Sequence, residues 1–360
     1  MMDIQTKLDL IKQVGEEIVT EEELKTLLET KTHPVAYDGF EPSGTDIHIA
    51  QGLMRSININ KMTKVGIKFK MLVADWHAWA NNKMGGDLEK IQKVGHYYIE
   101  VWKACGMDLK NIEFVWASDL LDDTEYWKTV MQIARKSTLK RVLRTVQIMG
   151  RSESDNLQAS QIFYPCMQTA DIFHLKVDIC QLGMDQRKVS MLARELAQDL
   201  GFWKPIIISH HMLAGLAEPP KTDTSTVDRA IELKMSKSKP DTAIFMTDSE
   251  EDIKRKVKKA WCPEGTIAEN PILEYFRYII FELVDEIEVK RPEKFGGNIV
   301  LKSYAELEKL FENKKIHPMD LKNTAAEYIN KLIEPIRNKI LNDPKIKKMR
   351  EEIKTFEVTR

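Results

Sequence analysis

The chain has 360 residues, of which 43% are hydrophobic and 30% are charged, as in an ordinary globular protein of about two domains. Its 54 lysines and arginines nearly balance its 55 aspartates and glutamates, so net charge gives no reason to expect a polyanionic partner, although local charge still can. No stretch approaches the roughly 18 uncharged apolar residues of a membrane span, and the acidic N-terminus lacks a signal-peptide pattern, so we expect no membrane association.

The N-terminal half shows a regular succession of elements. Residues 3–30 are rich in glutamate and predict a helical leader. After it, short apolar strands alternate with amphipathic helices, which is typical of parallel βαβ units. The expected strands are 35–40, 68–75, 111–118, 177–183 and 204–210. The expected helices between them are 49–66, 87–106 and 184–201. We therefore predict an α/β fold with a doubly wound, parallel, Rossmann-like sheet.

The alternation is interrupted and later ends. Between Leu120 and about Asp171 the pattern is helical only, which predicts an insertion between the third and fourth strands. Polar residues 217–230 predict a loop or linker, and from about Asp248 onward the chain is almost all helical. The expected parts are a helical leader (1–30), a Rossmann-like domain (31–230) with a helical insertion at about 120–171, a lysine-rich loop and linker (231–247), and an all-α C-terminal domain (248–360).

The first strand ends in a glycine-containing loop, "AYDGFEPSGTDIHIAQG", residues 36–52. Ligands of parallel sheets bind beyond the carboxyl ends of the strands, and Gly39 allows a ligand close to the backbone. His48 begins the following helix, whose free N–H groups favour anions, so the loop suits a nucleotide phosphate. Taken alone, a glycine-containing turn before a helix is more often purely structural.

A second loop, "LKMSKSKP" at 233–240, carries Lys234, Lys237 and Lys239 among serines. Lysine ammonium groups and hydroxyls together can hold a polyphosphate while pyrophosphate departs. For a generic loop of this composition, a solvated basic segment is the alternative interpretation.

The two loops together resemble the two signature motifs of class I aminoacyl-tRNA synthetases. "KMSKS" (234–238) matches in full, whereas "HIAQ" (48–51) has Ala50 and Gln51 where the family motif has glycine and a second histidine. In the family both motifs anchor ATP and stabilise attack by the amino-acid carboxylate on the α-phosphate. The resemblance implies catalytic roles for His48, Gln51, Lys234 and Lys237, and ATP-binding roles for Gly39, His48, Lys234, Ser236 and Lys237.

Seven segments, in order, resemble the tyrosyl-tRNA synthetases of the archaeal and eukaryotic type. They are "AYDGFEPSG", "ADWHAW", "YPCMQTADIFHLKVD", "GMDQRK", "KMSKSKPDTAIF", "RPEKFGG" and "HPMDLKN". The helical insertion resembles that family's dimer interface, which implies a homodimer.

The resemblance implies that Tyr37 and Asp171 bracket the substrate phenol. Tyr164, Gln168 and Gln186 match the contacts to the amino group of the substrate. The spacing of Tyr164, Gln168 and Asp171 (i, i+4, i+7) also places these three on one helix face, although a polar surface stripe would have the same spacing.

Gly183 and Asp185 match residues that hold the ATP ribose, although an aspartate at a strand end is also a common helix N-cap. His77 ends the second strand, and we leave it outside the catalytic set because it is equally plausible as a packed histidine.

RNA-facing residues are expected in two places. Arg135, Lys136, Lys140, Arg141 and Arg144 form a basic segment in which 136, 140 and 144 would stack along one helix face and meet the tRNA acceptor stem. A solvated helix face is the alternative. Phe295, His317 and Asp320 match positions that read the first anticodon base in archaeal-type members. Without the resemblance, "HPMD" predicts only a helix start.

Metal and disulfide patterns are missing from the sequence. Cys105, Cys166, Cys180 and Cys262 are far apart without a C-x-x-C pair, and the eight histidines show no metal spacing. We expect reduced thiols, a cytoplasmic protein and no protein-ligated metal, while Mg²⁺ can still enter with a nucleotide.

The resemblance thus implies ATP-dependent activation of tyrosine and its transfer to tRNA(Tyr). A tryptophanyl-tRNA synthetase is the nearest alternative, and Tyr37 with Asp171 argues against it. A non-catalytic tRNA-binding relative would be free to lose His48 and "KMSKS", and a nucleotidylyltransferase would not need the helical C-terminal domain.

Overall fold

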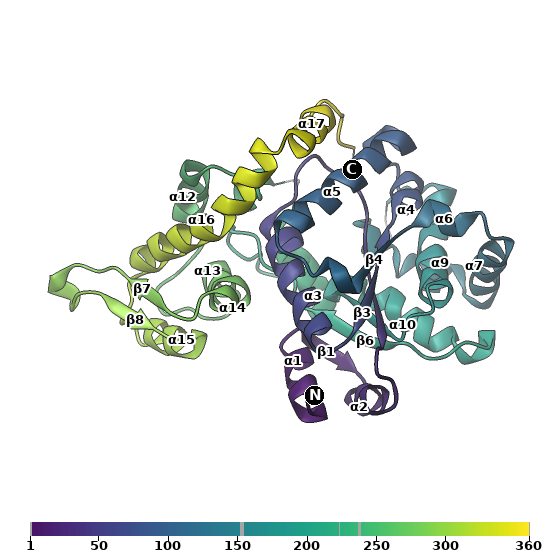
Figure 1. Ribbon diagram of the computed structural model, residues 1–360, viewed down its shortest axis with the longest axis horizontal. Helices are drawn as coiled ribbons and strands as arrows, with labels where there is room; N and C mark the ends of the chain where they lie inside the picture. Colours follow the sequence, from purple (N-terminus) through teal and green to yellow (C-terminus); the bar gives the residue numbers. More distant parts are fainter. Residues whose placement is uncertain (1, 152–154, 223, 237–238, 360) are drawn as a thin grey trace.

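The computed structural model describes residues 2–151, 155–222, 224–236 and 239–359. Its centre is a six-stranded sheet of order β1-β6-β5-β2-β3-β4 (Figure 1). The strands are β1 (Gly15–Val19), β2 (Val35–Phe40), β3 (Lys68–Val73), β4 (Ile112–Trp116), β5 (Ile179–Gly183) and β6 (Ile206–His210). β6, β5, β2, β3 and β4 are parallel, and β1 joins β6 antiparallel. The predicted doubly wound α/β sheet is confirmed.

Helices connect the strands and form the C-terminal region. Those of the N-terminal and sheet-bearing part are α1 (Ile4–Lys12), α2 (Glu21–Thr30), η1 (Ala50–Met54), α3 (Arg55–Lys64), α4 (Asp75–Ala80), η2 (Lys83–Gly86), α5 (Leu88–Ala104), η3 (Leu109–Asn111), α6 (Ala117–Leu121), α7 (Thr124–Lys136), α8 (Leu139–Leu143), η4 (Val146–Met149), α9 (Ala159–His174), η5 (Met184–Gln186), α10 (Arg187–Leu196), η6 (Gln198–Leu200) and α11 (Thr226–Leu233). Those further on are α12 (Glu250–Lys259), α13 (Pro271–Tyr275), η8 (Phe276–Ile280), α14 (Phe281–Leu283), η9 (Glu293–Phe295), α15 (Tyr304–Glu312), α16 (Pro318–Asn342) and α17 (Pro344–Ile353).

The sheet is buried on both faces because its side chains alternate between two cores. Phe69 and Met71 of β3 belong to the core formed with α1, α3 and α5. Leu72, between them, belongs with Tyr37 of β2 to the core formed with α9 and α10. Figure 1 shows α1 and α3 on one side of the strands and α9 and α10 on the other.

The order of the strands creates a crevice between β2 and β5. From β2 the chain continues to β3 and β4 on one side, and β5 and β6 then add to the other side of β2. This reversal of strand order is a topological switch point, where open α/β sheets bind ligands beyond the carboxyl ends of their strands. Gly39 near the end of β2 and Gly183 at the end of β5 therefore lie where a ligand of this sheet is expected to bind.

The prediction of an entirely helical leader was wrong. Residues Gly15–Val19 form β1, with Ile18 opposite Ile208 of the sheet edge. A five-residue strand between two amphipathic helices has no local signal of its own, and tertiary pairing to the edge of β6 determines it. The second leader helix then begins at Thr20, which forms a capping box with Glu23.

The helical insertion is confirmed, since α6, α7, α8 and α9 lie between β4 and β5. The predicted loop at 217–230 is shorter than expected because Ser225 caps α11, which begins at Thr226. The C-terminal region is helical as expected, with one unpredicted hairpin of β7 (Ile287–Val289) and β8 (Ile299–Leu301). α17 packs on α5, where Lys345 contacts Glu100 at 2.7 Å.

Candidate active site

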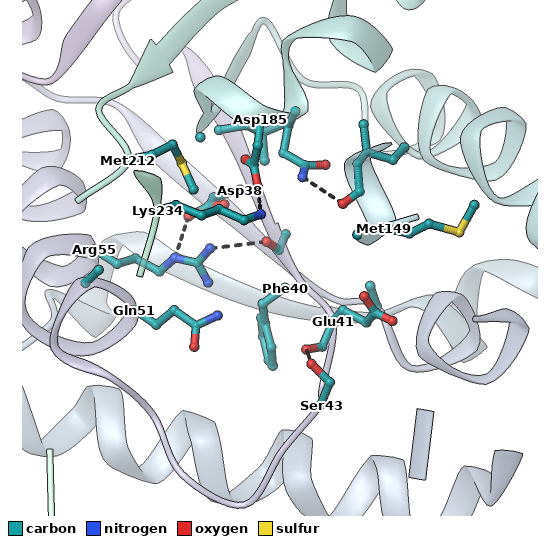
Figure 2. A pocket seen from close by; sticks show the side chains of 18 of the residues that line it. Asp38, Phe40, Glu41, Ser43, Gln51, Arg55, Met149, Asp185, Met212 and Lys234 are labelled. Atoms are coloured by element: carbon teal, nitrogen blue, oxygen red, sulfur yellow. Dashed lines mark hydrogen bonds and ion pairs between the residues drawn. The ribbon is translucent and has the colours of Figure 1, made fainter. Parts of the chain in front are cut away.

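A cavity of about 910 Å³ lies at the switch point between β2 and β5. Figure 2 shows side chains from β2, η1, α3, η5 and the end of α11 pointing into it. Of the residues predicted to bind tyrosine or ATP, it is lined by Tyr37, Gly39, His48, Gln51, Tyr164, Gln168, Asp171, Gly183, Asp185, Gln186, Lys234 and Ser236. Lys237 lies outside the described residues. Residues separated by up to 200 positions are thus brought to one cavity.

Asp171 lines the cavity, is fully buried and has two partners. The Tyr126 hydroxyl donates to its Oδ1 over 2.8 Å, and His77 Nε2 lies 2.9 Å from its Oδ2. The His77 contact is an ion pair by distance, although neither ring nitrogen has hydrogen-bond geometry. Burial alone would lower the pKa of His77, but the Asp171 carboxylate outweighs burial and raises it. The Asp171 carboxylate therefore favours the protonated form of the imidazole.

Tyr37 lines the same cavity from β2 and is buried. Burial and the nearby Asp171 raise the pKa of its phenol well above the ordinary value, so the hydroxyl stays protonated and able to donate. Tyr126 was not predicted as a site residue, and His77 was left outside the predicted catalytic set. No local pattern identifies Tyr126, which comes from α7 of the insertion.

Two glutamines and a tyrosine line the neighbouring wall. Gln168 Nε2 donates to Gln186 Oε1 over 3.1 Å, and Gln186 Nε2 donates to the Ile148 carbonyl over 3.0 Å. The Tyr164 ring packs edge-on to the His77 ring with centroids 5.0 Å apart. Tyr164, Gln168 and Asp171 share one face of α9 and are all buried, so the surface-stripe alternative is wrong.

The two motif loops are joined by backbone hydrogen bonds. Ile49 N–H donates to the Ile244 carbonyl over 2.8 Å, and Met246 N–H donates to the Ile47 carbonyl over 2.9 Å. A bridge between His48 and Phe245 lies between these two bonds. The chain that follows "KMSKS" is therefore fastened to the start of η1, which explains how loops far apart in sequence share one cavity.

Asp185 and Lys234 meet across the cavity, with Lys234 Nζ 2.7 Å from Asp185 Oδ2 (Figure 2). The N-cap residue of α10 is Gln186, which makes no side-chain cap bond. Asp185 therefore forms this ion pair and does not cap the helix. Gly183 is required for the arrangement. A Cβ there would lie 2.5 Å from Met212 Sδ and 2.7 Å from Asp185 Oδ1.

A second ion pair, Asp38 with Arg55, was not anticipated from the sequence. Arg55 Nε lies 3.1 Å from Asp38 Oδ2, and the carboxylate is almost completely buried. Burial raises the pKa of Asp38 to about 6 even though Arg55 opposes the shift. Nearby, burial and the Arg55 charge lower the pKa of His210 to about 4, so this cavity-lining imidazole is neutral at pH 7.

The basic segment at 135–144 is not one helix face, so that prediction was wrong. α7 ends at Lys136, and Thr138 starts α8 by accepting from the Arg141 backbone N–H. Thr138 is a strong N-cap residue, and a cap at this position breaks the helix that the spacing of four implied. Arg141 pairs with Glu195 at 2.8 Å. Arg135, Lys136, Lys140 and Arg144 are nevertheless all exposed.

The residues expected to read the anticodon lie in the C-terminal region. Phe295 is 62% exposed at the end of η9. His317 caps α16 through Nδ1, with Asp320 in the first turn, as the unaided pattern predicted. Arg291 connects the two segments, because its Nε donates to the Gly297 carbonyl and its Nη1 to the Lys315 carbonyl.

Among the described ranges, no cluster of three or more His, Cys, Asp and Glu side chains is arranged to hold a metal ion. Within the same ranges, no helix has the length and apolarity needed to cross a membrane. All four cysteines are unpaired, and three of them are buried.

Comparison with known proteins agrees with this geometry. Residues 29–334 match the family model of the class I tRNA synthetases of the tryptophan and tyrosine type. A cytoplasmic tyrosine–tRNA ligase of Arabidopsis thaliana is 49% identical over 99% of this chain and 90% of its own length. A tyrosyl-tRNA synthetase of Pyrococcus horikoshii, solved with L-tyrosine, superposes with a TM-score of 0.89 at 41% identity, over 98% of this chain and all of that one.

A tryptophanyl-tRNA synthetase of Aeropyrum pernix is much less similar. It is 19% identical with a TM-score of 0.68, over 98% of this chain and 93% of that one, which shows a shared fold alone. The chain therefore belongs to the class I tRNA synthetases, and within them to the tyrosine–tRNA ligases.

Proposed function

We propose that this chain activates L-tyrosine with ATP and transfers the tyrosyl group to the terminal adenosine of tRNA(Tyr) at the cavity between β2 and β5. The tyrosine carboxylate attacks the α-phosphorus, forming the mixed anhydride as the bond to pyrophosphate breaks. A ribose hydroxyl of the tRNA then attacks the carbonyl carbon, and AMP leaves. The observation that carries the proposal is one cavity lined both by the buried Asp171 and by the ion pair of Lys234 with Asp185.

The part of the cavity around Asp171 would hold the phenol of the substrate tyrosine. The Tyr37 hydroxyl can donate a hydrogen bond to the phenolic oxygen of the substrate, and the Asp171 carboxylate can accept a hydrogen bond from the substrate hydroxyl. Phenylalanine has no hydroxyl, so Tyr37 would lose its acceptor and Asp171 would lose one hydrogen bond in a buried site, an effect for which tyrosine–tRNA ligases are themselves the standard example. Tyr164, Gln168 and Gln186 would receive the substrate ammonium group, since all three side chains line the same cavity and carry oxygen acceptors.

The part of the cavity around Lys234 would hold ATP, which would enter as its Mg²⁺ complex. Asp185 would accept from the ribose hydroxyls, with Gly183 and Gly39 allowing the nucleotide close to the backbone. Binding of the ribose would release Lys234 from Asp185 to the phosphates. His48, Gln51 and Ser236 would donate hydrogen bonds to phosphate oxygens. Lys237 is proposed for the same role on the resemblance alone. Catalysis would be positioning and charge stabilisation, without a covalent enzyme intermediate.

The tRNA would span both parts of the chain. The exposed Arg135, Lys136, Lys140 and Arg144, with Arg141 beside them, would meet the phosphates of the acceptor stem. The helical region 248–360 would bind the anticodon, with Phe295 stacking on its first base and Asp320 and His317 recognising its edge.

The chain would act in the cytoplasm, since the similar Arabidopsis ligase is named as a cytoplasmic enzyme. Its helical insertion would form the interface of a homodimer. Trp127 and Met131 on α7 and Phe163 on α9 are 36%, 55% and 40% exposed. α7 and α9 pack together, so these side chains can form one apolar surface.

Charging of tRNA tests the proposal. Purified chain, ATP and labelled tyrosine should acylate a tRNA(Tyr) transcript, with tRNA(Trp) and tryptophan as the matched negative pair. Charging of tRNA(Trp) with tryptophan instead would overturn the assignment of the pocket. Binding of tRNA(Tyr) without any charging would support a non-catalytic relative.

A further inference from the structure

We propose that Arg55 is a further phosphate-binding residue of this site, whose guanidinium Nη1 donates to an ATP phosphate oxygen during adenylate formation. The inference rests on the proposed function and adds a residue outside both sequence motifs. It is drawn from the position of Arg55, from the hydrogen bonds that its side chain makes and from the charges of its neighbours.

Arg55 is placed to reach the cavity. It is the first residue of α3, which continues directly from η1, and it comes four positions after Gln51. Side chains on helices lean toward the N-terminus, so that of Arg55 points back toward the start of η1. Figure 2 shows Gln51, Arg55 and Lys234 reaching into the same cavity from different elements. Only 14% of the Arg55 side chain is exposed.

The guanidinium is held in place but incompletely bonded. Its Nε lies 3.1 Å from Asp38 Oδ2, its Nη2 donates to the Gly39 carbonyl over 3.4 Å, and it lies over the Trp102 ring at 5.5 Å. Nη1 is buried and has no hydrogen-bond partner within the described residues. Buried, charged donors are normally bonded, because an unpaired one loses its hydration without replacement. An anionic oxygen in the cavity would supply the missing acceptor.

The surrounding charges favour the same conclusion. Gln51 is neutral, and the cavity-lining His210 is neutral at pH 7 because its pKa is lowered to about 4. Lys234 already pairs with Asp185. Asp38 fixes the orientation of the guanidinium, yet neither of its oxygens has an aligned hydrogen-bond donor within the described part of the chain. Arg55 is thus a preorganised cation that can meet charge developing on the departing pyrophosphate.

Neutralising Asp38 is the competing role for Arg55, and it can be separated by mutation. Arg55→Met removes the cation but leaves Asp38 buried and unpaired. The double variant Asp38→Asn/Arg55→Met removes both charges, so a purely structural defect should disappear in it. Arg55→Lys keeps the charge and loses the planar fork.

The experiment is ATP–pyrophosphate exchange with tyrosine, with tyrosine binding measured by calorimetry to show that the pocket is intact. We expect Arg55→Met to lower kcat/KM for ATP by about 10²–10³-fold and the double variant to remain equally slow, while both still bind tyrosine. Arg55→Lys should lose roughly tenfold. Recovery of the wild-type rate in the double variant, or wild-type kinetics in Arg55→Met, would overturn the inference. A wild-type chain inactive with tyrosine would instead overturn the proposed function.

Discussion

His211 connects three parts of the chain, and its protonation should make stability depend on pH. Its ring lies 3.4 Å from Glu16 of β1 and 3.0 Å from Glu274 of α13, and it stacks on Tyr278 with centroids 4.3 Å apart. Burial alone would lower the pKa of His211, but hydrogen bonds to the two glutamates outweigh it and raise the pKa to about 9. A histidine with a raised pKa stabilises the fold below its unfolded-state pKa of 6.5, and the contribution disappears as pH rises through about 9.

The size of the effect follows from the shift. At about 1.4 kcal/mol per pKa unit, the rise from 6.5 to about 9 corresponds to at most about 3–4 kcal/mol of unfolding free energy. We expect His211→Gln to be less stable than the wild type by about that amount near pH 6, with the difference shrinking steadily toward pH 9. Urea unfolding across this range measures it, and His96→Gln, at an exposed histidine, serves as the control.

A difference between wild type and His211→Gln that stays constant from about pH 6 to about pH 9 would refute this reasoning. It would mean that His211 contributes by packing on Tyr278 rather than by charge.

Three further outcomes follow from the structure. Tyr126→Phe removes the hydroxyl that donates to Asp171, so tyrosine affinity measured by calorimetry should fall by roughly tenfold, and unchanged affinity would contradict the contact. Gly183→Ala places a Cβ 2.7 Å from Asp185 Oδ1, so the KM for ATP should rise roughly tenfold or more while tyrosine binding is retained; equal rises for both substrates would count against a local effect. Met131→Glu adds a charge to the exposed apolar surface of α7, so light scattering should show a dimer for the wild type, as proposed, and monomers for the variant; a variant that stays dimeric would place the interface elsewhere.

Sequence patterns predicted the bounds of an element well where a periodic segment also had local start or stop signals. α5 was predicted at 87–106 and found at Leu88–Ala104, because Asp87 caps its start and Gly106, at φ 77°, follows its end. β2 was found at the predicted residues, since a short apolar run before a glycine-containing loop is seldom anything else.

The same reasoning could not find β1 or the Asp38–Arg55 pair. β1 exists because the edge of β6 accepts it, and Asp38 meets Arg55 because β2 and α3 pack side by side. Both are consequences of tertiary structure, and a polar residue within a strand pattern gives no sign of its eventual partner. The prediction of one basic helix face at 135–144 was wrong for a local reason instead, because Thr138 acts as an N-cap and starts a new helix.

ATP–pyrophosphate exchange without tRNA, run in parallel with tyrosine, tryptophan and phenylalanine, tests the central claim most directly. The buried pair of Tyr37 and Asp171 predicts exchange with tyrosine alone. Exchange with tryptophan in place of tyrosine, or equally fast exchange with phenylalanine, would contradict the account of this cavity.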